Sequence, residues 1–209
     1  MKTPSEKTCT PESPTVGVST AGVPAAGVPT AGISTSKNKL YFYSNVTSQS
    51  LLDLRKQILA LVDDQKIDNI VKGTPFYPIE VHIQSNGGEL PPALAMVDFM
   101  SVTSNTVPIY TYCEGVVASA ATFLAICGKR RFITENSIML IHQLSGITWG
   151  KYSEIADDFK NSTMLMNTMR KMYEKYTRLP KEKLENLLSS DLYLSAKTCL
   201  RYKIVDEII

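Results

Sequence analysis

Strand-like and helix-like segments alternate along the chain between residues 40 and 141. The clearest is residues 79–84, Ile-Glu-Val-His-Ile-Gln, where apolar and polar side chains alternate strictly, as in a half-buried strand. Other strands are expected at residues 40–43, 107–112 and 137–141, and helices at residues 51–63, 91–100 and 119–127. Strands separated by helices favour βαβ units around a largely parallel sheet, so the predicted fold class is α/β.

The first 38 residues differ in composition from the rest of the chain. All 10 tyrosines, all 6 phenylalanines and the 1 tryptophan lie beyond them. A pentapeptide of the type Thr-Ala-Gly-Val-Pro repeats from Thr15 to Ser34, and its spaced Gly and Pro disfavour both helix and sheet. We therefore expect a flexible arm at residues 1–38 and one folded domain at residues 39–209. A targeting peptide is the alternative, against which the acids Glu6 and Glu12 count.

A long helix is expected after Trp149. Its apolar and aromatic side chains recur three or four positions apart, with Ser162 at the one gap: Tyr152, Ile155, Phe159, Met166, Met169, Tyr173 and Tyr176. This spacing predicts a helix of about six turns with a narrow apolar seam of the kind that meets another helix. An ordinary amphipathic helix packed on the sheet is the alternative.

Composition argues against several classes of function. The 22 basic and 20 acidic side chains leave a net charge of +2, which gives no field suited to nucleic acid or to a membrane surface. No apolar run reaches the roughly 18–20 residues that span a bilayer. The 4 cysteines form no CxxC pair, so we expect neither zinc nor disulfides, and a reducing compartment.

Two short segments could carry chemistry. Ser85-Asn-Gly-Gly88 ends a predicted strand, and a glycine pair allows a tight turn whose N–H groups bind a phosphate or an oxyanion. A simple turn is the alternative. Ser119 lies among small residues at the predicted start of a helix, where it would be either an N-cap or a nucleophile assisted by the amides of that helix.

A nucleophilic serine needs a base, and the chain has 2 histidines. His82 lies on the polar face of an alternating strand, where we expect it to be solvated. His142 follows the apolar run 138–141 and would be either a core histidine or the base. Asp191 would be either a helix N-cap or the acid that orients His142.

Taken in order, these segments resemble the ClpP family of self-compartmentalised serine peptidases. The resemblance covers about residues 39–209. The matching segments are Ser85-Asn-Gly-Gly88, Gly115-Val-Val-Ala-Ser119-Ala, Lys129-Arg-Arg-Phe132, Asn136-Ser-Ile-Met-Leu-Ile-His-Gln143, Tyr176-Thr-Arg-Leu-Pro180, Asp191-Leu-Tyr-Leu-Ser-Ala196 and Ile204-Val-Asp206.

The resemblance implies a fold, an activity and a set of roles. The fold is the ClpP/crotonase type, with repeated βαβ units and a long projecting handle helix. The activity is that of a serine endopeptidase that cuts unfolded polypeptides into short peptides. Ser119 corresponds to the nucleophile, His142 to the general base and Asp191 to the orienting acid, and the amides of Gly88 and Ala120 correspond to the oxyanion hole. No cofactor or metal is implied in this chain.

The resemblance also implies an assembly of two stacked heptameric rings, joined through the long helix. Its ATP-using partner would be a hexameric AAA+ unfoldase, and its compartment the cytoplasm, with an organellar matrix or stroma as the alternative. However, the family's apolar docking pocket is altered here. It would contain Glu80, His82, Glu114 and Thr134 beside Tyr112 and Phe132, so the surface that would dock the unfoldase is atypical of the family.

Two other classes of function remain as alternatives. One is a catalytically silent, ClpP-like structural subunit of a mixed ring, which the polar docking pocket would suit. The other is an enzyme of the wider crotonase-like fold that acts on acyl-CoA through oxyanion amides.

Overall fold

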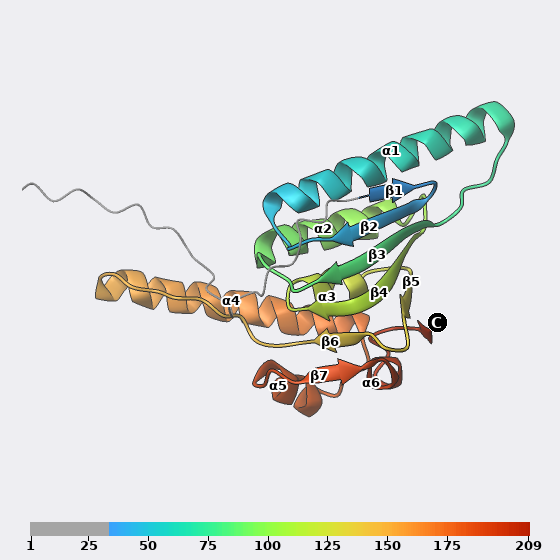
Figure 1. Ribbon diagram of the computed structural model, residues 1–209. Helices are drawn as coiled ribbons and strands as arrows, with labels where there is room; N and C mark the ends of the chain where they lie inside the picture. The colour runs from blue at the N-terminus through green and yellow to red at the C-terminus, as the bar shows by residue number, and fades with distance from the viewer. Residues whose placement is uncertain (1–33) are drawn as a thin grey trace, which may run out of the picture.

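An eight-stranded sheet organises the computed structural model, which describes residues 34–209 (Figure 1). The strands are β1 (Ser34–Ser36), β2 (Lys39–Tyr43), β3 (Ile79–Ser85), β4 (Ile109–Ala118), β5 (Arg130–Ile133), β6 (Ile138–Leu140), β7 (Tyr193–Ser195) and β8 (Glu207–Ile208). The helices are α1 (Ser48–Lys72), α2 (Leu90–Thr103), α3 (Ala121–Ile126), α4 (Tyr152–Tyr176), α5 (Lys181–Leu188) and α6 (Ala196–Arg201).

The sheet is mostly parallel, which confirms the predicted α/β class. Its path runs β1-β2-β3-β4-β5-β8, and β6 and β7 extend it from the far half of β4. Among the described strands, only β1 with β2 and β6 with β7 pair antiparallel. The first half of β4 pairs with β5 and its second half with β6, so the carboxyl end of β4 lies between β3 and β6.

One face of the sheet carries the hydrophobic core. Side chains such as Leu40, Val81 and Ile109 are fully buried there, against α1, α2 and α3. Every residue of α3 is buried, so this short helix lies inside the molecule rather than on its surface. The strict alternation of β3 predicted the core face correctly.

Helix α1 is longer than its apolar pattern predicted, since it begins at Ser48 and ends at Lys72. Its N-cap is Thr47, whose side chain accepts a hydrogen bond from the Ser50 N–H at 3.1 Å. Its end is set by Gly73, which adopts the left-handed conformation with φ 67°. The expected end at Asp63 was wrong because the buried face of α1 ends at Gln65. The apolar residues beyond it, Ile67, Ile70 and Val71, keep helical spacing but are exposed and lie off that face.

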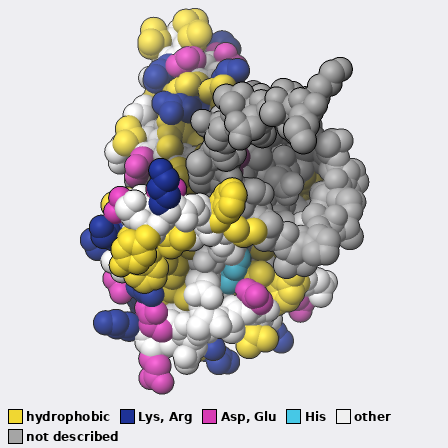
Figure 2. Space-filling view, turned by 90° about the vertical axis from the view of Figure 1, so that its left-hand side faces the viewer, with side chains coloured by type: hydrophobic (Ala, Val, Ile, Leu, Met, Phe, Trp, Pro, Cys, Tyr) yellow, Lys and Arg dark blue, Asp and Glu magenta, His cyan; other side chains and the backbone are white. Residues whose placement is uncertain are grey.

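Helix α4 has the bounds that the apolar seam predicted. Met169 and Tyr173, in its second half, are buried, whereas Tyr152 and Phe159 in its first half are 89% and 74% exposed. The first half extends beyond the sheet (Figure 1), and hydrophobic side chains gather on that side of the molecule (Figure 2). The alternative of a helix lying wholly on the sheet is therefore wrong.

The N-terminal arm was expected to reach residue 38. Strand β1 lies within its last residues and pairs with β2, where Ser36 is opposite Lys39. This pairing extends the folded part of the chain by a few residues. The rest of the expected arm, residues 1–33, lies outside the described residues.

A half-buried ion pair ties β5 to the segment that precedes β8. The Arg131 guanidinium donates to both carboxylate oxygens of Asp206, at 3.0 and 2.7 Å, and it also bonds the Tyr176 carbonyl at the end of α4. Burial by itself would raise the pKa of Asp206, but the hydrogen bonds and the charge of Arg131 lower it below its usual value. The pair therefore stabilises the fold when Asp206 is ionised.

We expect Asp206→Asn to lower the free energy of unfolding by about 2 kcal/mol at pH 7. A lowered carboxyl pKa stabilises the fold above the unfolded-state pKa of about 3.9, and this contribution disappears as the pH falls through the lower folded-state value. Urea unfolding of wild type and Asp206→Asn at pH 7 and pH 3 should show a smaller difference in unfolding free energy at pH 3. Glu207→Gln is the matched control, because the Arg130–Glu207 pair is half exposed and contributes about 1 kcal/mol or less. Equal effects of the two substitutions would contradict this account.

Candidate active site

The glycine turn after β3 is held in place by the loop before α1. The N–H of Val46 donates to the Gly87 carbonyl, and the N–H of Glu89 donates to the Val46 carbonyl, both at 2.8 Å. This bridge does not use the N–H of Gly88. Gly88 has φ 147°, and a Cβ on it would lie 2.1 Å from the Val46 carbonyl oxygen, so only glycine fits. The structure thus keeps one backbone donor at the carboxyl end of β3 out of the sheet.

Ser119 lies beside this turn in a strained conformation. Its φ is 54°, a value that serine rarely adopts, and its N–H donates to the Leu140 carbonyl at 2.9 Å. A Cβ added to Gly87 would lie 2.6 Å from the Cβ of Ser119, so the two segments are in close contact. The N-cap alternative for Ser119 is wrong, because α3 begins at Ala121 and its N-cap is Ala120.

Strand register brings His142 and Asp191 to the same end of the sheet. Strands β4 and β6 pair Ala118 with Leu140, and β6 and β7 pair Leu140 with Tyr193. Continued by two residues, the antiparallel register places His142 opposite Asp191. The His142 Nδ1 lies 3.5 Å from the Asp191 Oδ1. The N-cap alternative for Asp191 is wrong, since α5 ends at Leu188 and the cap of α6 is Ser195.

The three candidate side chains differ in exposure. The His142 side chain is 21% exposed and that of Asp191 is 80% exposed. Within residues 34–209, no hydrogen bond joins the Ser119 hydroxyl to His142. Catalytic hydrogen bonds often tighten only when substrate is bound.

Similarity to known proteins identifies the family of this chain. The sequence profile of the Clp protease family matches residues 34–209. The chain belongs to the Clp protease family. The ATP-dependent Clp protease proteolytic subunit of Deinococcus radiodurans is 30% identical over 176 residues, which is 83% of this chain and 81% of that protein. A protein of the same name from Dehalococcoides mccartyi strain 195 is 30% identical over 172 residues, or 80% and 85% of the two chains.

The family match confirms the resemblance seen in the sequence, and the parallel sheet with its long helix agrees with the fold that the Clp protease family implies. Among the described residues, no helix is both long and apolar enough for a membrane span. The same part of the chain brings no three His, Cys, Asp or Glu side chains together as metal ligands.

The position of His82 differs from the expectation of a solvated side chain. It is 7% exposed, and its ring stacks between those of Tyr41 and Tyr112, at 4.7 and 4.6 Å between centroids. Its Nδ1 is 2.7 Å from the Glu114 carboxylate. Aromatic neighbours on β2 and β4 cover the ring, and these neighbours are set by strand register rather than by the alternation of β3.

Three cysteines of this Clp protease family member are buried free thiols, namely Cys113, Cys127 and Cys199. Burial raises the pKa of Cys127 and of Cys199 to about 12, and it raises that of Cys113 further. A thiol that stays protonated is a poor nucleophile. None of the three therefore competes with Ser119 for that role.

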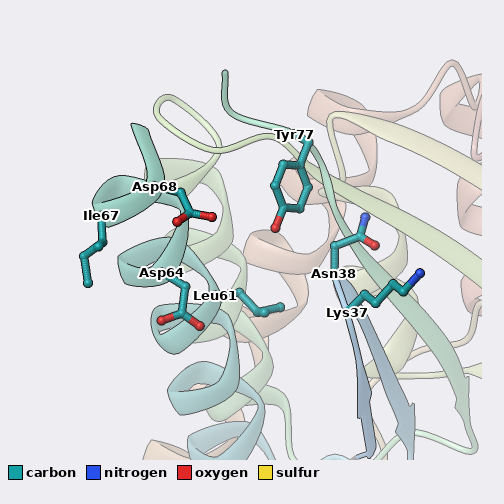
Figure 3. A pocket seen from close by; sticks show the side chains of 7 residues that line it. All are labelled: Lys37, Asn38, Leu61, Asp64, Ile67, Asp68 and Tyr77. Atoms are coloured by element: carbon teal, nitrogen blue, oxygen red, sulfur yellow. The ribbon is translucent and has the colours of Figure 1, made fainter. Parts of the chain in front are cut away.

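A separate surface pocket of about 580 Å³ lies between α1 and the β1–β2 turn (Figure 3). Leu61, Asp64 and Asp68 line it from α1 and Tyr77 lines its other side, whereas the Lys37 side chain extends away from α1. This pocket lies near the amino end of β3, whereas the glycine turn follows its carboxyl end. It is therefore not part of the candidate active site.

One polar residue near the site, Thr122, is not among the residues that the sequence patterns predicted. Thr122 lies in the otherwise apolar α3, and its hydroxyl donates to the Ser119 carbonyl at 2.6 Å. A single hydroxyl within a fully apolar helix is the signal that could have drawn attention to it, because buried polar groups need a partner.

Proposed function

We propose that this chain is a serine endopeptidase subunit that cuts unfolded polypeptides into short peptides. The observation that carries the proposal is the convergence of the Gly87–Gly88 turn, Ser119 and His142, which follow the parallel strands β3, β4 and β6, with Asp191, which precedes the antiparallel strand β7. Membership of the Clp protease family supports the same reaction class.

In the proposed reaction, the hydroxyl of Ser119 attacks the carbonyl carbon of a peptide bond. His142 takes the hydroxyl proton and then delivers it to the leaving amine, while Asp191 orients the imidazole and stabilises its charged form. The N–H groups of Gly88 and Ala120 donate to the oxyanion. Water, activated by His142, then hydrolyses the acyl-enzyme and restores the serine.

A fluorophosphonate probe tests the proposal directly, because it reacts with an activated serine and not with an ordinary one. We expect the native protein to be labelled at Ser119, as mapped by peptide mass spectrometry, and the denatured protein to remain unlabelled. The same preparation should hydrolyse a fluorogenic peptide. A native, folded chain that neither reacts nor cleaves would contradict the proposed function.

Asp191→Ala should reduce kcat by about 10²–10³-fold, which is less than the loss expected when the nucleophile is removed. Its carboxylate orients and stabilises His142 but forms no bond with the substrate, and its side chain is 80% exposed. Steady-state kinetics on a short peptide would measure this loss. The exposed Asp63→Ala on α1 is the control, and it should keep wild-type kinetics. Full activity of Asp191→Ala would point to another orienting acid.

We further propose assembly into two stacked heptameric rings, with the cytoplasm as the working compartment. The exposed first half of α4, with Tyr152 and Phe159 among its apolar side chains, supports helix-to-helix contact between copies. The buried free thiols support a reducing compartment. Two relatives carry ATP-dependent in their names, which supports a partner that uses ATP, such as an AAA+ unfoldase.

A second candidate function is a catalytically silent subunit of a mixed ring. The observation that favours it is the aromatic face of the sheet, formed by Tyr41, His82, Tyr112 and Phe132, where Glu114 bonds to His82. An apolar loop docked there would remove the remaining water from the carboxylates of Glu80 and Glu114, and the loss of that hydration is unfavourable. The fluorophosphonate experiment separates the two candidates, because a silent subunit would assemble without labelling.

A further inference from the structure

A buried chain of two hydroxyl groups joins α4 to the backbone of Ser119. The Tyr173 hydroxyl on α4 lies 2.6 Å from the Thr122 Oγ1 on α3, and the Thr122 Oγ1 lies 2.6 Å from the Ser119 carbonyl oxygen. Both side chains are 0% exposed. Polar groups this deeply buried are retained only when they are paired, and these two are paired with each other and with one backbone atom.

The direction of the hydrogen bonds follows from the chemistry of the three groups. A carbonyl oxygen only accepts, so the single hydroxyl hydrogen of Thr122 points to Ser119. The Tyr173 hydroxyl must then donate to Thr122. Burial raises the pKa of the Tyr173 phenol, which therefore keeps the proton that it donates.

Fixing the Ser119 carbonyl also fixes the next N–H. The Ser119 carbonyl and the Ala120 N–H belong to one planar trans peptide unit and point in opposite directions. The carbonyl is held twice, by the Thr122 hydroxyl at 2.6 Å and by the Thr122 N–H at 3.0 Å. The Ala120 N–H is thereby directed away from Thr122 and the interior.

This orientation has to be maintained against strain. Ser119 has φ 54°, in the left-handed region that is unfavourable for residues other than glycine. If its peptide unit relaxed, the Ala120 N–H would rotate with it. The hydroxyl pair is well placed to prevent this rotation, because Tyr173 is itself anchored by its ring, 4.9 Å from that of Phe123.

We propose that Thr122 and Tyr173 are positioning residues that hold the Ala120 N–H in the orientation needed to donate to the oxyanion. The inference rests on the proposed function, in which that N–H belongs to the oxyanion hole. It assigns a role to the inner half of α4, the helix whose outer half extends beyond the sheet (Figure 1). The hydrogen bonds from Tyr173 through Thr122 thus connect the projecting helix to the segment that contains Ser119.

The test compares wild type, Thr122→Val, Tyr173→Phe and Thr122→Ser as full chains on a fluorogenic peptide. Valine and phenylalanine keep the shape of the side chain and remove its hydroxyl. We expect kcat to fall about tenfold in Thr122→Val and Tyr173→Phe with KM within about twofold, since the oxyanion exists only in the transition state. Thr122→Ser keeps the hydroxyl and should recover most of the lost kcat.

Thr111→Val is the matched control for a lost buried hydroxyl. The Thr111 Oγ1 donates to the Ala125 carbonyl at 2.6 Å, at the opposite end of α3 from Ser119. Thermal unfolding should show comparable losses of stability in Thr111→Val and Thr122→Val, whereas only the latter should lose kcat.

Three results would overturn the inference while leaving the proposed function intact. The first is an active wild type with unchanged kcat in Thr122→Val and Tyr173→Phe. The others are a loss of kcat in Thr111→Val equal to that in Thr122→Val, and a kcat of Thr122→Ser no higher than that of Thr122→Val. A folded wild type that neither cleaves peptide nor reacts with fluorophosphonate would overturn both this inference and the proposed function.

Discussion

Ser119→Ala is expected to abolish peptide hydrolysis, with a loss of at least about a thousandfold in kcat/KM. The hydroxyl is the proposed nucleophile, and no neighbouring group in the site replaces it, because the three described cysteines are buried thiols. The Ser119 side chain does not cap α3, so its removal should change the free energy of unfolding by about 1 kcal/mol or less. Hydrolysis of a fluorogenic peptide and urea unfolding together measure the two effects.

Ser189→Ala controls for the substitution itself. Ser189 is exposed and lies at the end of α5, where its hydroxyl bonds the Asn186 carbonyl. This variant should keep both activity and stability. If Ser119→Ala retained activity within tenfold of wild type, Ser119 would not be the nucleophile.

The second large effect is expected for Gly88→Ala. The added Cβ would lie 2.1 Å from the Val46 carbonyl oxygen, and alanine is strained at φ 147°. Backbone rather than a flexible side chain has to move, so we expect a loss of about 2–4 kcal/mol in unfolding free energy. The movement would displace the proposed oxyanion donor and lower kcat by about a hundredfold or more.

Gly73→Ala separates these effects from the loss of a glycine as such. Gly73 also has a positive φ, 67°, but a Cβ there meets no atom within 4 Å. We expect this variant to lose about 1 kcal/mol of stability and no activity. Similar kinetics of Gly73→Ala and Gly88→Ala would show that the glycine turn does not position a catalytic amide.

The sequence predicted the core face of β3 well, but its expectation that His82 is solvated was wrong. Alternation along a strand shows which side chains share a face, and Val81 and Ile83 are buried as expected. It does not show which residues lie across from that face on neighbouring strands. The burial of His82 between Tyr41 and Tyr112 depends on the register of β2 and β4 with β3.

The individual candidate residues could also be found in the sequence, whereas their arrangement could not. Ser119, His142 and Asp191 are marked by the small residues, the apolar run and the motif order around them. Local evidence left an N-cap open for two of them, and the structure removes that alternative because neither residue caps a helix. The 3.5 Å approach of His142 to Asp191 required the pairing of β6 with β7, which joins segments about 50 residues apart.

By itself, the sequence determined the α/β class, the bounds of α4 and the family, because periodicity and motif order are local properties of the chain. Only the tertiary structure decided the strained φ of Ser119, the contact of Gly87 with it and the Tyr173–Thr122 pair. Each of these depends on how separate elements pack against one another. Packing is set by register and by side-chain shape across the whole core, and no single stretch of sequence contains that information.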